Sequence, residues 1–218
     1  MPNLTELAIK YSSDKYHWHS YLPIYTALFE GGHFGMPVVG VKNLDYCFFC
    51  KYRSDSPVIP ECINKGIQVK RLLEIGIGHE SLMKPFLPAD VPYVHGSGLK
   101  MWEEYFPEAK IFGCDIREDV LVNEGRIHSM VCDQLSSFDL GFMIGTFGQE
   151  WDVIIDDGCH DYEAQHFTAS LLLHYAKPSL YVIEDVWADK GKLLAAAFGG
   201  EFWQGKKGRD DGLVIIRK

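Results

Sequence analysis

Carboxylate side chains recur at the ends of short apolar runs in this sequence. Four such runs are followed by acids, and a fifth carries one within it. The carboxyl ends of parallel strands lie at the same edge of a sheet, so we expect these acids to lie close together. A row of carboxylates repels itself unless something cationic binds there. The pattern therefore predicts a site for a cationic ligand. The seven acids are Glu74, Asp115, Asp133, Asp156, Asp157, Glu184 and Asp185.

The charge balance supports this interpretation. The chain has 30 acidic and 21 basic residues, a formal net charge of −9, and setting the seven acids aside leaves −9 + 7 = −2. An acidic protein lacks the basic face that binding to nucleic acid requires. No apolar run approaches the roughly 18 residues that cross a bilayer, and residues 1–20 do not have the pattern of a signal peptide. We expect a cytoplasmic protein with no nucleic-acid or membrane partner; a homo-oligomer stays open.

The spacing of the apolar runs indicates the fold. From residue 69 onward, runs without polar alternation are separated by segments of helical period, which is typical of a parallel sheet covered on both faces. Residues 201–204 and 213–217 predict a terminal antiparallel hairpin. We therefore predict an α/β fold, a Rossmann-like, doubly wound, seven-stranded, mostly parallel sheet. The other expected strands cover residues 69–75, 110–114, 126–131, 151–155 and 180–183.

The first 68 residues are predicted to form a helical and loop cover segment. With the Rossmann-like core at 69–218 they would make one domain, because 218 residues is the size of an ordinary domain. Asn3 can cap a first helix, and Ser20 can cap a second that ends at Gly31-Gly32. Residues 33–68 give only weak signals and read as an irregular loop or cover.

Six cysteines leave a metal or redox alternative open. Cys47 and Cys50 have zinc-knuckle spacing, and Cys62 follows twelve residues later. No second pair stands at standard spacing, and nothing in the spacing favours His33 as a fourth ligand. We interpret these cysteines as small buried hydrophobic residues.

A glycine turn follows the first run of the predicted core. Gly76-Ile77-Gly78 is preceded by Glu74, and His79-Glu80-Ser81 follows without the third glycine of a dinucleotide-binding loop. A carboxylate at this turn would repel a phosphate but suits a cationic ligand that carries a ribose. A plain strand-to-helix turn is the alternative, and the other strand-end acids count against it.

At these residues the sequence resembles the class I S-adenosylmethionine-dependent methyltransferases. The resemblance implies that Glu74, Gly76 and Gly78 form the first cofactor motif. It also implies that Asp115 contacts the ribose hydroxyls, with Ile116 beside it. Asp133 and Gln134 match the position that contacts the adenine.

A narrower resemblance covers nearly the whole chain, except residues 33–68. Four segments are together similar to the metal-dependent sugar O-methyltransferases of macrolide biosynthesis, of macrocin and mycinamicin type. This resemblance implies that Asp157, Glu184 and Asp185 hold Mg²⁺ and that His160 is the general base. The hard oxygen ligands of such a set suit Mg²⁺. The segments are Tyr11–Tyr16, Gly96–Trp102, Ile155–His160 and Val182–Asp185.

Alternation along a strand sends Asp156 and Asp157 to opposite sides. Spacing does not say which one faces the site; the resemblance selects Asp157 and places it near the cofactor too. His160 has rivals as the base, and a solvated polar helix end is the alternative for the N-terminal segment. The rival histidines are His17, His19 and His166. The N-terminal segment predicted to close over the methionyl end of the cofactor contains Tyr11, Ser12, Asp14 and Lys15, of which Lys15 would pair with the cofactor carboxylate. Ser97 would line the same pocket, and Trp187 is a candidate acceptor contact.

The sequence therefore predicts an S-adenosylmethionine- and Mg²⁺-dependent O-methyltransferase. Its expected acceptor is a small molecule or glycan with vicinal hydroxyls, methylated on a sugar hydroxyl. A bound ion would lower the pKa of that hydroxyl, and the base would take its proton. A catechol-like phenol is the alternative acceptor. A non-catalytic module that only binds the cofactor is the alternative function, although such a module would have no need for the intact metal and base residues.

Overall fold

The computed structural model describes residues 2–32, 34–37, 45–49, 64–208 and 210–218. They form two compact units. One contains Met1–Tyr21 and Val69–Lys218, and the other is Leu22–Gln68. All candidate site residues lie in the first unit, which is described first.

The first unit is built on a seven-stranded sheet with the strand order β5-β4-β3-β6-β7-β9-β8. The five strands from β5 to β7 run parallel, whereas β9 pairs antiparallel with both β7 and β8. The predicted fold class, terminal hairpin included, is confirmed. The strands are β3 (Arg71–Ile75), β4 (Lys110–Asp115), β5 (Ile127–Val131), β6 (Val153–Asp156), β7 (Leu180–Ile183), β8 (Glu201–Gln204) and β9 (Gly212–Arg217).

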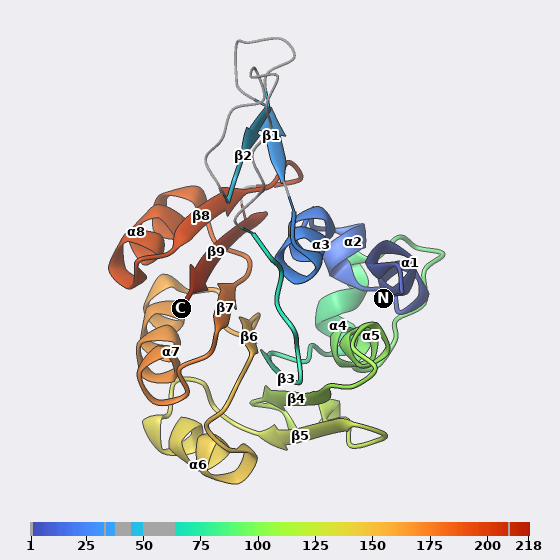
Figure 1. Cartoon of the computed structure of the whole chain (residues 1–218). Helices are drawn as coiled ribbons and strands as arrows, with labels where there is room; N and C mark the ends of the chain where they lie inside the picture. The colour runs from blue at the N-terminus through green and yellow to red at the C-terminus, as the bar shows by residue number, and fades with distance from the viewer. Residues whose placement is uncertain (1, 33, 38–44, 50–63, 209) are drawn as a thin grey trace. The chain divides into compact units, whose positions relative to one another are not determined.

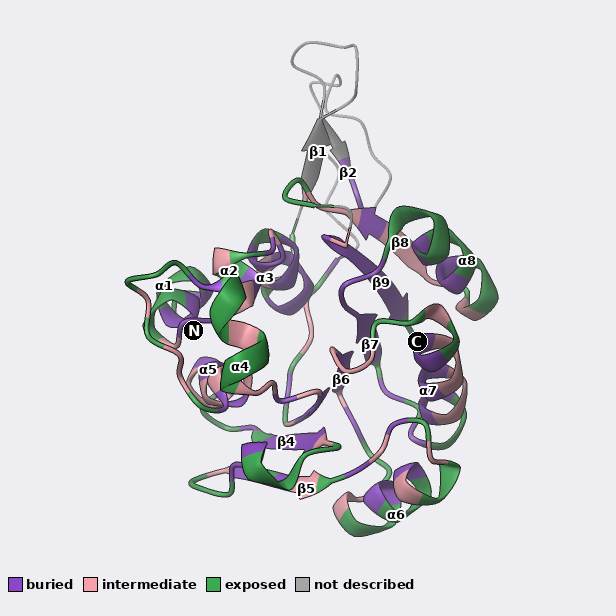
Figure 2. Ribbon diagram, turned by 180° about the vertical axis from the view of Figure 1, so that it is seen from behind, coloured by how far each residue is buried: buried purple, intermediate pink, exposed green. Residues whose placement is uncertain are grey.

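Helices cover both faces of this sheet. In Figure 1, α6, α7 and α8 line one face, and α1, α4 and α5 lie on the other. Every residue of β6 and β7 is buried, as expected for parallel strands covered twice; Figure 2 shows these strands in the buried colour. The helices are α1 (Leu4–Lys10), α2 (Asp14–His17), α4 (Glu80–Met83), α5 (Ser97–Tyr105), α6 (Ser137–Phe147), α7 (Tyr162–Tyr175) and α8 (Ala188–Phe198), with 3-10 turns η1 (Lys84–Phe86) and η2 (Glu118–Val120).

The predicted helix caps had different outcomes. Asn3 caps α1 as predicted, because its side chain accepts from the backbone N–H groups of Thr5 and Glu6. The cap predicted at Ser20 is wrong, since the next helix begins two residues later. The Ser20 hydroxyl instead donates to Oδ2 of Asp211 at 2.5 Å, which ties the N-terminal segment to the loop of the terminal hairpin.

The second unit contains α3 (Leu22–Glu30), which ends before Gly31 as predicted. The expectation of an irregular segment from residue 33 is wrong in part, because β1 (Gly35–Pro37) and β2 (Asp45–Cys47) form an antiparallel pair. The side-chain amide of Asn64 donates to the carbonyl oxygen of Ala27 at 2.5 Å, which fastens the end of this unit to α3.

Cys47 is buried, as expected for a small hydrophobic residue. Cys50, Cys62 and His33 lie outside the described residues, so the structure does not test the zinc alternative. Among the helices that the structure describes, none has the length and apolar character that crossing a membrane would require.

Candidate active site at the carboxyl ends of the strands

The glycine turn leaves β3 in a conformation that favours glycine. Gly76 has φ +88° and Gly78 has φ +79°. A side chain at Gly76 would also collide with the carbonyl oxygen of Asp157, so only glycine fits there. The turn therefore runs directly against the loop that follows β6.

Asp115, at the end of β4, supports this turn. Its Oδ2 accepts from the backbone N–H of Ile77 at 2.9 Å and of Gly78 at 3.4 Å. Its Oδ1 accepts from the N–H of Arg117 at 3.0 Å. The next residue, Ile116, is 66% exposed. The acid predicted to contact a ribose thus lies beside the glycine turn, with an exposed apolar neighbour.

The two adjacent aspartates at the end of β6 face different ways, as strand alternation requires. Asp156 is buried in the core, where its carboxylate accepts from the Tyr181 hydroxyl at 3.0 Å and from Nε2 of Gln134 at 3.3 Å. Burial raises the pKa of Asp156 to about 7. Asp156 is therefore a support for the core and not a member of the site, whereas Asp157 is.

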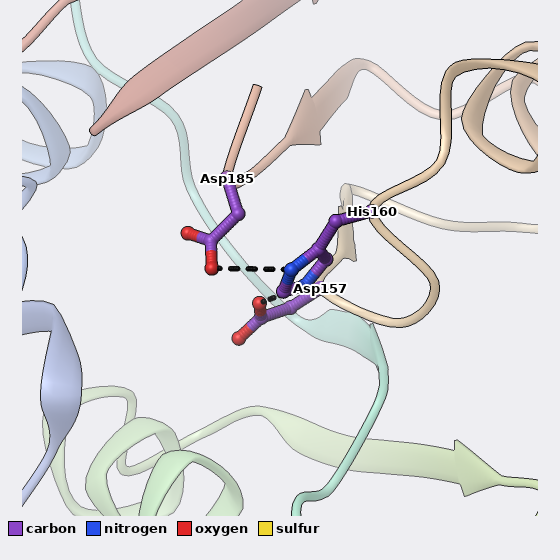
Figure 3. A group of neighbouring side chains, drawn as sticks. All are labelled: Asp157, His160 and Asp185. Carbon is purple, nitrogen blue, oxygen red and sulfur yellow. Dashed lines mark ion pairs between the residues drawn. The ribbon is translucent and has the colours of Figure 1, made fainter. Parts of the chain in front are cut away.

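Asp157, His160 and Asp185 converge in the loops after β6 and β7. Nε2 of His160 lies 3.5 Å from Oδ1 of Asp157, and its Nδ1 lies 3.4 Å from Oδ2 of Asp185. Figure 3 shows the imidazole ring between the two carboxylates. Burial works to lower the pKa of His160, but the bond to Asp157 and the charge of Asp185 outweigh it and raise the pKa to about 9.

Glu184 and Glu74 lie around a buried cation. The ammonium group of Lys15 lies 2.6 Å from Glu184, 2.9 Å from Asp157 and 3.2 Å from Glu74, and its side chain is 2% exposed. Burial disfavours the charged ammonium, yet the surrounding carboxylates outweigh it and the pKa of Lys15 lies well above its usual value. Burial raises the pKa of Glu74 to about 7, partly offset by Lys15. In this structure Lys15 thus pairs with carboxylates of the chain itself, rather than standing ready for a cofactor carboxylate.

The remaining residues of the predicted N-terminal cofactor segment flank Lys15. Tyr11 donates its hydroxyl to Glu104 at 2.6 Å. Ser12 is buried with φ +56°, and Asp14 opens α2. Ser97 opens α5 on the same unit. The polar segment is therefore folded against the core and is not a solvated helix end.

Gln134, predicted beside the adenine, has protein partners instead. Its Nε2 donates to Asp156 and to the Thr168 hydroxyl, and its Oε1 accepts from the backbone N–H of Cys159 at 2.6 Å. Asp133 accepts from the N–H of Leu135 at 2.9 Å, in the turn after β5. Gln134 thus holds the loop that carries Asp157 and His160.

The structure separates the histidines proposed as the base. Nε2 of His19 lies 3.3 Å from Oδ1 of Asp185, so His19 is at the edge of the site. His166 packs against Phe198 on α8, with ring centroids 5.1 Å apart. Nε2 of His17 is buried and has no hydrogen-bond partner among the residues that the structure describes. Trp187, just after Asp185, is 52% exposed. His160 is the histidine between both aspartates.

Two supports of the site are not evident from the sequence. The Tyr21 hydroxyl donates to Oδ1 of Asp185 at 2.7 Å, and Asp211 accepts from the backbone N–H of Ser20 at 2.9 Å. In the sequence, Tyr21 belongs to an apolar stripe and Asp211 to a polar hairpin loop, so neither residue stands out as part of a site.

The side chains fit a divalent ion. Among the described residues, Asp157, His160 and Asp185 can each offer one ligand atom, and these atoms lie within 4.8 Å of one another. Hard carboxylate oxygens in that arrangement suit Mg²⁺. Glu184, the predicted third ligand, is not part of this group, because its Oε2 faces Lys15.

Comparison with known proteins points to one class of enzyme. The chain is 33% identical over 135 residues to mycinamicin VI 2''-O-methyltransferase of Micromonospora griseorubida, covering 62% of this chain and 30% of that protein. It is 34% identical over 137 residues to demethylmacrocin O-methyltransferase of Streptomyces fradiae, covering 62% of this chain and 31% of that protein. The chain thus spans about a third of the length of these curated relatives. No family model matches it.

A solved structure shares the fold. The MycE methyltransferase of the mycinamycin biosynthetic pathway, in complex with Mg, SAH and mycinamycin VI, is 27% identical, with a TM-score of 0.57. The match covers 84% of this chain and 39% of that one. These comparisons confirm the resemblance to the macrocin- and mycinamicin-type sugar O-methyltransferases.

Proposed function

We propose that this chain is an S-adenosylmethionine- and Mg²⁺-dependent O-methyltransferase that acts on a hydroxyl of a sugar or glycoside. The observation that carries the proposal is the placement of His160 between Asp157 and Asp185, next to the glycine turn. A candidate base, oxygen ligands and a cofactor turn are thereby brought to one edge of the sheet. The sugar O-methyltransferases named above support the substrate class.

In this proposal the cofactor lies along the glycine turn. The turn offers a close backbone approach at Gly76 and Gly78, and Asp115 and Asp133 lie at the ends of the neighbouring strands. The negative charge of this edge suits the sulfonium of S-adenosylmethionine. Lys15 and Gln134 would have to give up the protein partners described above in order to contact the cofactor. The remaining proposed contacts, these two included, are Tyr11, Ser12, Asp14, Lys15, Glu74, Ser97, Ile116, Gln134 and Asp157.

Asp157 and Asp185 would hold the ion, with Glu184 as the proposed third carboxylate. When bound, Mg²⁺ supplies positive charge that lowers the pKa of an acceptor hydroxyl. His160 would accept the proton of that hydroxyl, and the acceptor oxygen would bond to the methyl carbon as its bond to the sulfonium sulfur breaks, giving S-adenosylhomocysteine. The charges of Asp157 and Asp185 raise the pKa of His160 to about 9. An ion held by these two carboxylates would offset their charge, lower the pKa of His160 again and favour the neutral imidazole that can take a proton. A base so placed contributes about 10²–10⁴-fold to the rate.

The experiment has a binding arm and a turnover arm. S-adenosylhomocysteine and Mg²⁺ are titrated calorimetrically into the wild type, Asp157→Ala and Glu108→Ala, a matched exposed acid outside the site. We expect ion binding to be lost in Asp157→Ala and kept in Glu108→Ala. A wild type that binds neither ligand contradicts the proposal.

The turnover arm screens acceptors with methyl-labelled cofactor. Glycosides with free vicinal sugar hydroxyls are compared with catechols, and EDTA is added in parallel. Labelling of glycosides that EDTA abolishes supports the proposal. Labelling of catechols alone would favour the phenolic alternative, and turnover that EDTA leaves unchanged would contradict the role of the ion.

A further inference from the structure

We propose that Tyr21 is a positioning residue that fixes the carboxylate of Asp185 for a divalent ion. This inference rests on the proposed function and adds to the site a residue that lies outside the predicted motifs. Tyr21 belongs to the N-terminal segment, 164 residues away in the sequence, and its side chain is fully buried.

Asp185 needs such support because of its backbone. It has φ +56°, in the left-handed region that residues other than glycine seldom adopt. Such a conformation persists only where the surrounding structure holds it. The backbone N–H of Asp185 donates to the Tyr21 oxygen at 3.1 Å, and the Tyr21 O–H donates back to Oδ1 of Asp185 at 2.7 Å. One hydroxyl group thus holds both the main chain and the side chain of the same residue.

The two oxygens of Asp185 consequently differ in their surroundings. Oδ1 faces Tyr21, and Nε2 of His19 lies 3.3 Å from it. Oδ2 faces His160 at 3.4 Å, on the side where Asp157 also lies. The hydroxyl therefore directs one oxygen of Asp185 into the site by binding the other.

The segment that carries Tyr21 is itself anchored. The Tyr21 ring stacks on His19 with centroids 4.6 Å apart. Asp211 accepts from the backbone N–H of Ser20 at 2.9 Å, from the Ser20 hydroxyl at 2.5 Å and from the N–H of Lys207 at 2.7 Å. The hairpin loop thus fixes the position of the residue next to Tyr21. Outer contacts of this kind orient metal ligands, and their loss commonly weakens ion binding.

The test is Tyr21→Phe, which removes one hydroxyl group and keeps the ring. The matched control is Tyr181→Phe, because Tyr181 is also fully buried and donates to an aspartate, Asp156, at 3.0 Å. Affinity for Mn²⁺ alone is measured by calorimetry and by the paramagnetic resonance signal of free Mn²⁺. Affinity for S-adenosylhomocysteine and the melting temperature are measured on the same samples.

We expect Tyr21→Phe to weaken Mn²⁺ binding about 10- to 100-fold, with the affinity for S-adenosylhomocysteine unchanged. Tyr181→Phe should leave Mn²⁺ affinity at the wild-type value. Equal Mn²⁺ affinity of Tyr21→Phe and wild type overturns the inference, and so does an equal loss in both variants.

A milder variant covers the case in which Tyr21→Phe does not fold. Ser20→Ala removes only the hydroxyl that binds Asp211 and so loosens the segment that carries Tyr21, and we expect a loss of Mn²⁺ affinity smaller than that of Tyr21→Phe. An unchanged affinity there overturns the inference as well. A wild type that binds no Mn²⁺ contradicts the ion in the proposed function, which is a different result from variants that bind as wild type does.

Discussion

Replacing Lys15 by methionine tests whether the buried ammonium group stabilises the acidic site. Methionine nearly preserves the length and apolar stem of lysine, so the change removes a charge without opening a large cavity. In the wild type the ammonium lies within 3.2 Å of Glu74, Asp157 and Glu184. Without it, these carboxylates would lose the cation that all three share.

The expected loss is large because the group is buried. Breaking a buried ion pair by removing one partner costs about 3–5 kcal/mol. For a protein of this size, each kcal/mol changes the melting temperature by about 2–4 °C. We therefore expect Lys15→Met to lower the melting temperature by roughly 6–20 °C. A stability loss of this size is expected because both partners are buried: the Lys15 side chain is 2% exposed and that of Glu184 is 1% exposed.

Thermal and urea unfolding in EDTA, at pH 8, measure this loss. Lys10→Met is the matched control, because Lys10 also pairs with a carboxylate, Glu104, but has a side chain that is 55% exposed. Water screens an exposed pair, which therefore contributes little to stability, so the control should melt close to the wild type. If Lys15→Met loses no more stability than Lys10→Met, the argument from burial is refuted.

The sign of the pH dependence gives a second check on Lys15→Met. Burial already raises the pKa of Glu74 to about 7 in the wild type, while Lys15 works to lower it. Removing Lys15 raises the carboxyl pKa values further, so protonation at low pH relieves the repulsion in the variant. The stability difference between the variant and the wild type should therefore shrink as the pH falls from 8 to 5. A difference that stays constant over this range would contradict the proposed repulsion.

Three further predictions concern single positions. Gly76→Ala should cost more stability than Gly199→Ala, because both positions have positive φ but only a side chain at position 76 would collide with Asp157. Gly76→Ala should also weaken S-adenosylhomocysteine binding in calorimetry. Equal losses of stability in the two variants would contradict this prediction. For Asp156, the folded pKa of about 7 lies above the unfolded value, so its contribution is present below about pH 4 and lost as the pH rises through 7. Asp156→Asn should therefore gain roughly 4 kcal/mol relative to wild type between pH 4 and 8 in urea titrations, and an unchanged difference would count against it. His160→Gln should lower methyl transfer about 10²–10⁴-fold in the labelled-cofactor assay with S-adenosylhomocysteine binding unchanged, and near-normal turnover would exclude His160 as the base.

The sheet could be predicted from the sequence because its signals are local. The central strands β6 and β7 are short apolar runs, and the acids that mark their ends stand at or directly after the last apolar residue. The order of the strands then brings Gly76, Asp115 and Asp157 to one edge without any further information. The short β1–β2 pair cannot be predicted in this way, because its strands have three residues each, which is too short for a periodic pattern.

The support of the site could not be predicted, because it depends on contacts between distant parts of the chain. Lys15 is 142 residues from Asp157 and 169 from Glu184, and Tyr21 is 164 from Asp185. A polar residue on a short helix and a tyrosine in an apolar stripe each have an ordinary local explanation. Their roles follow only when the N-terminal segment is folded onto the strand ends. A motif at the end of a strand thus predicts which carboxylates gather, whereas the long-range contacts decide which oxygen of each carboxylate faces the site.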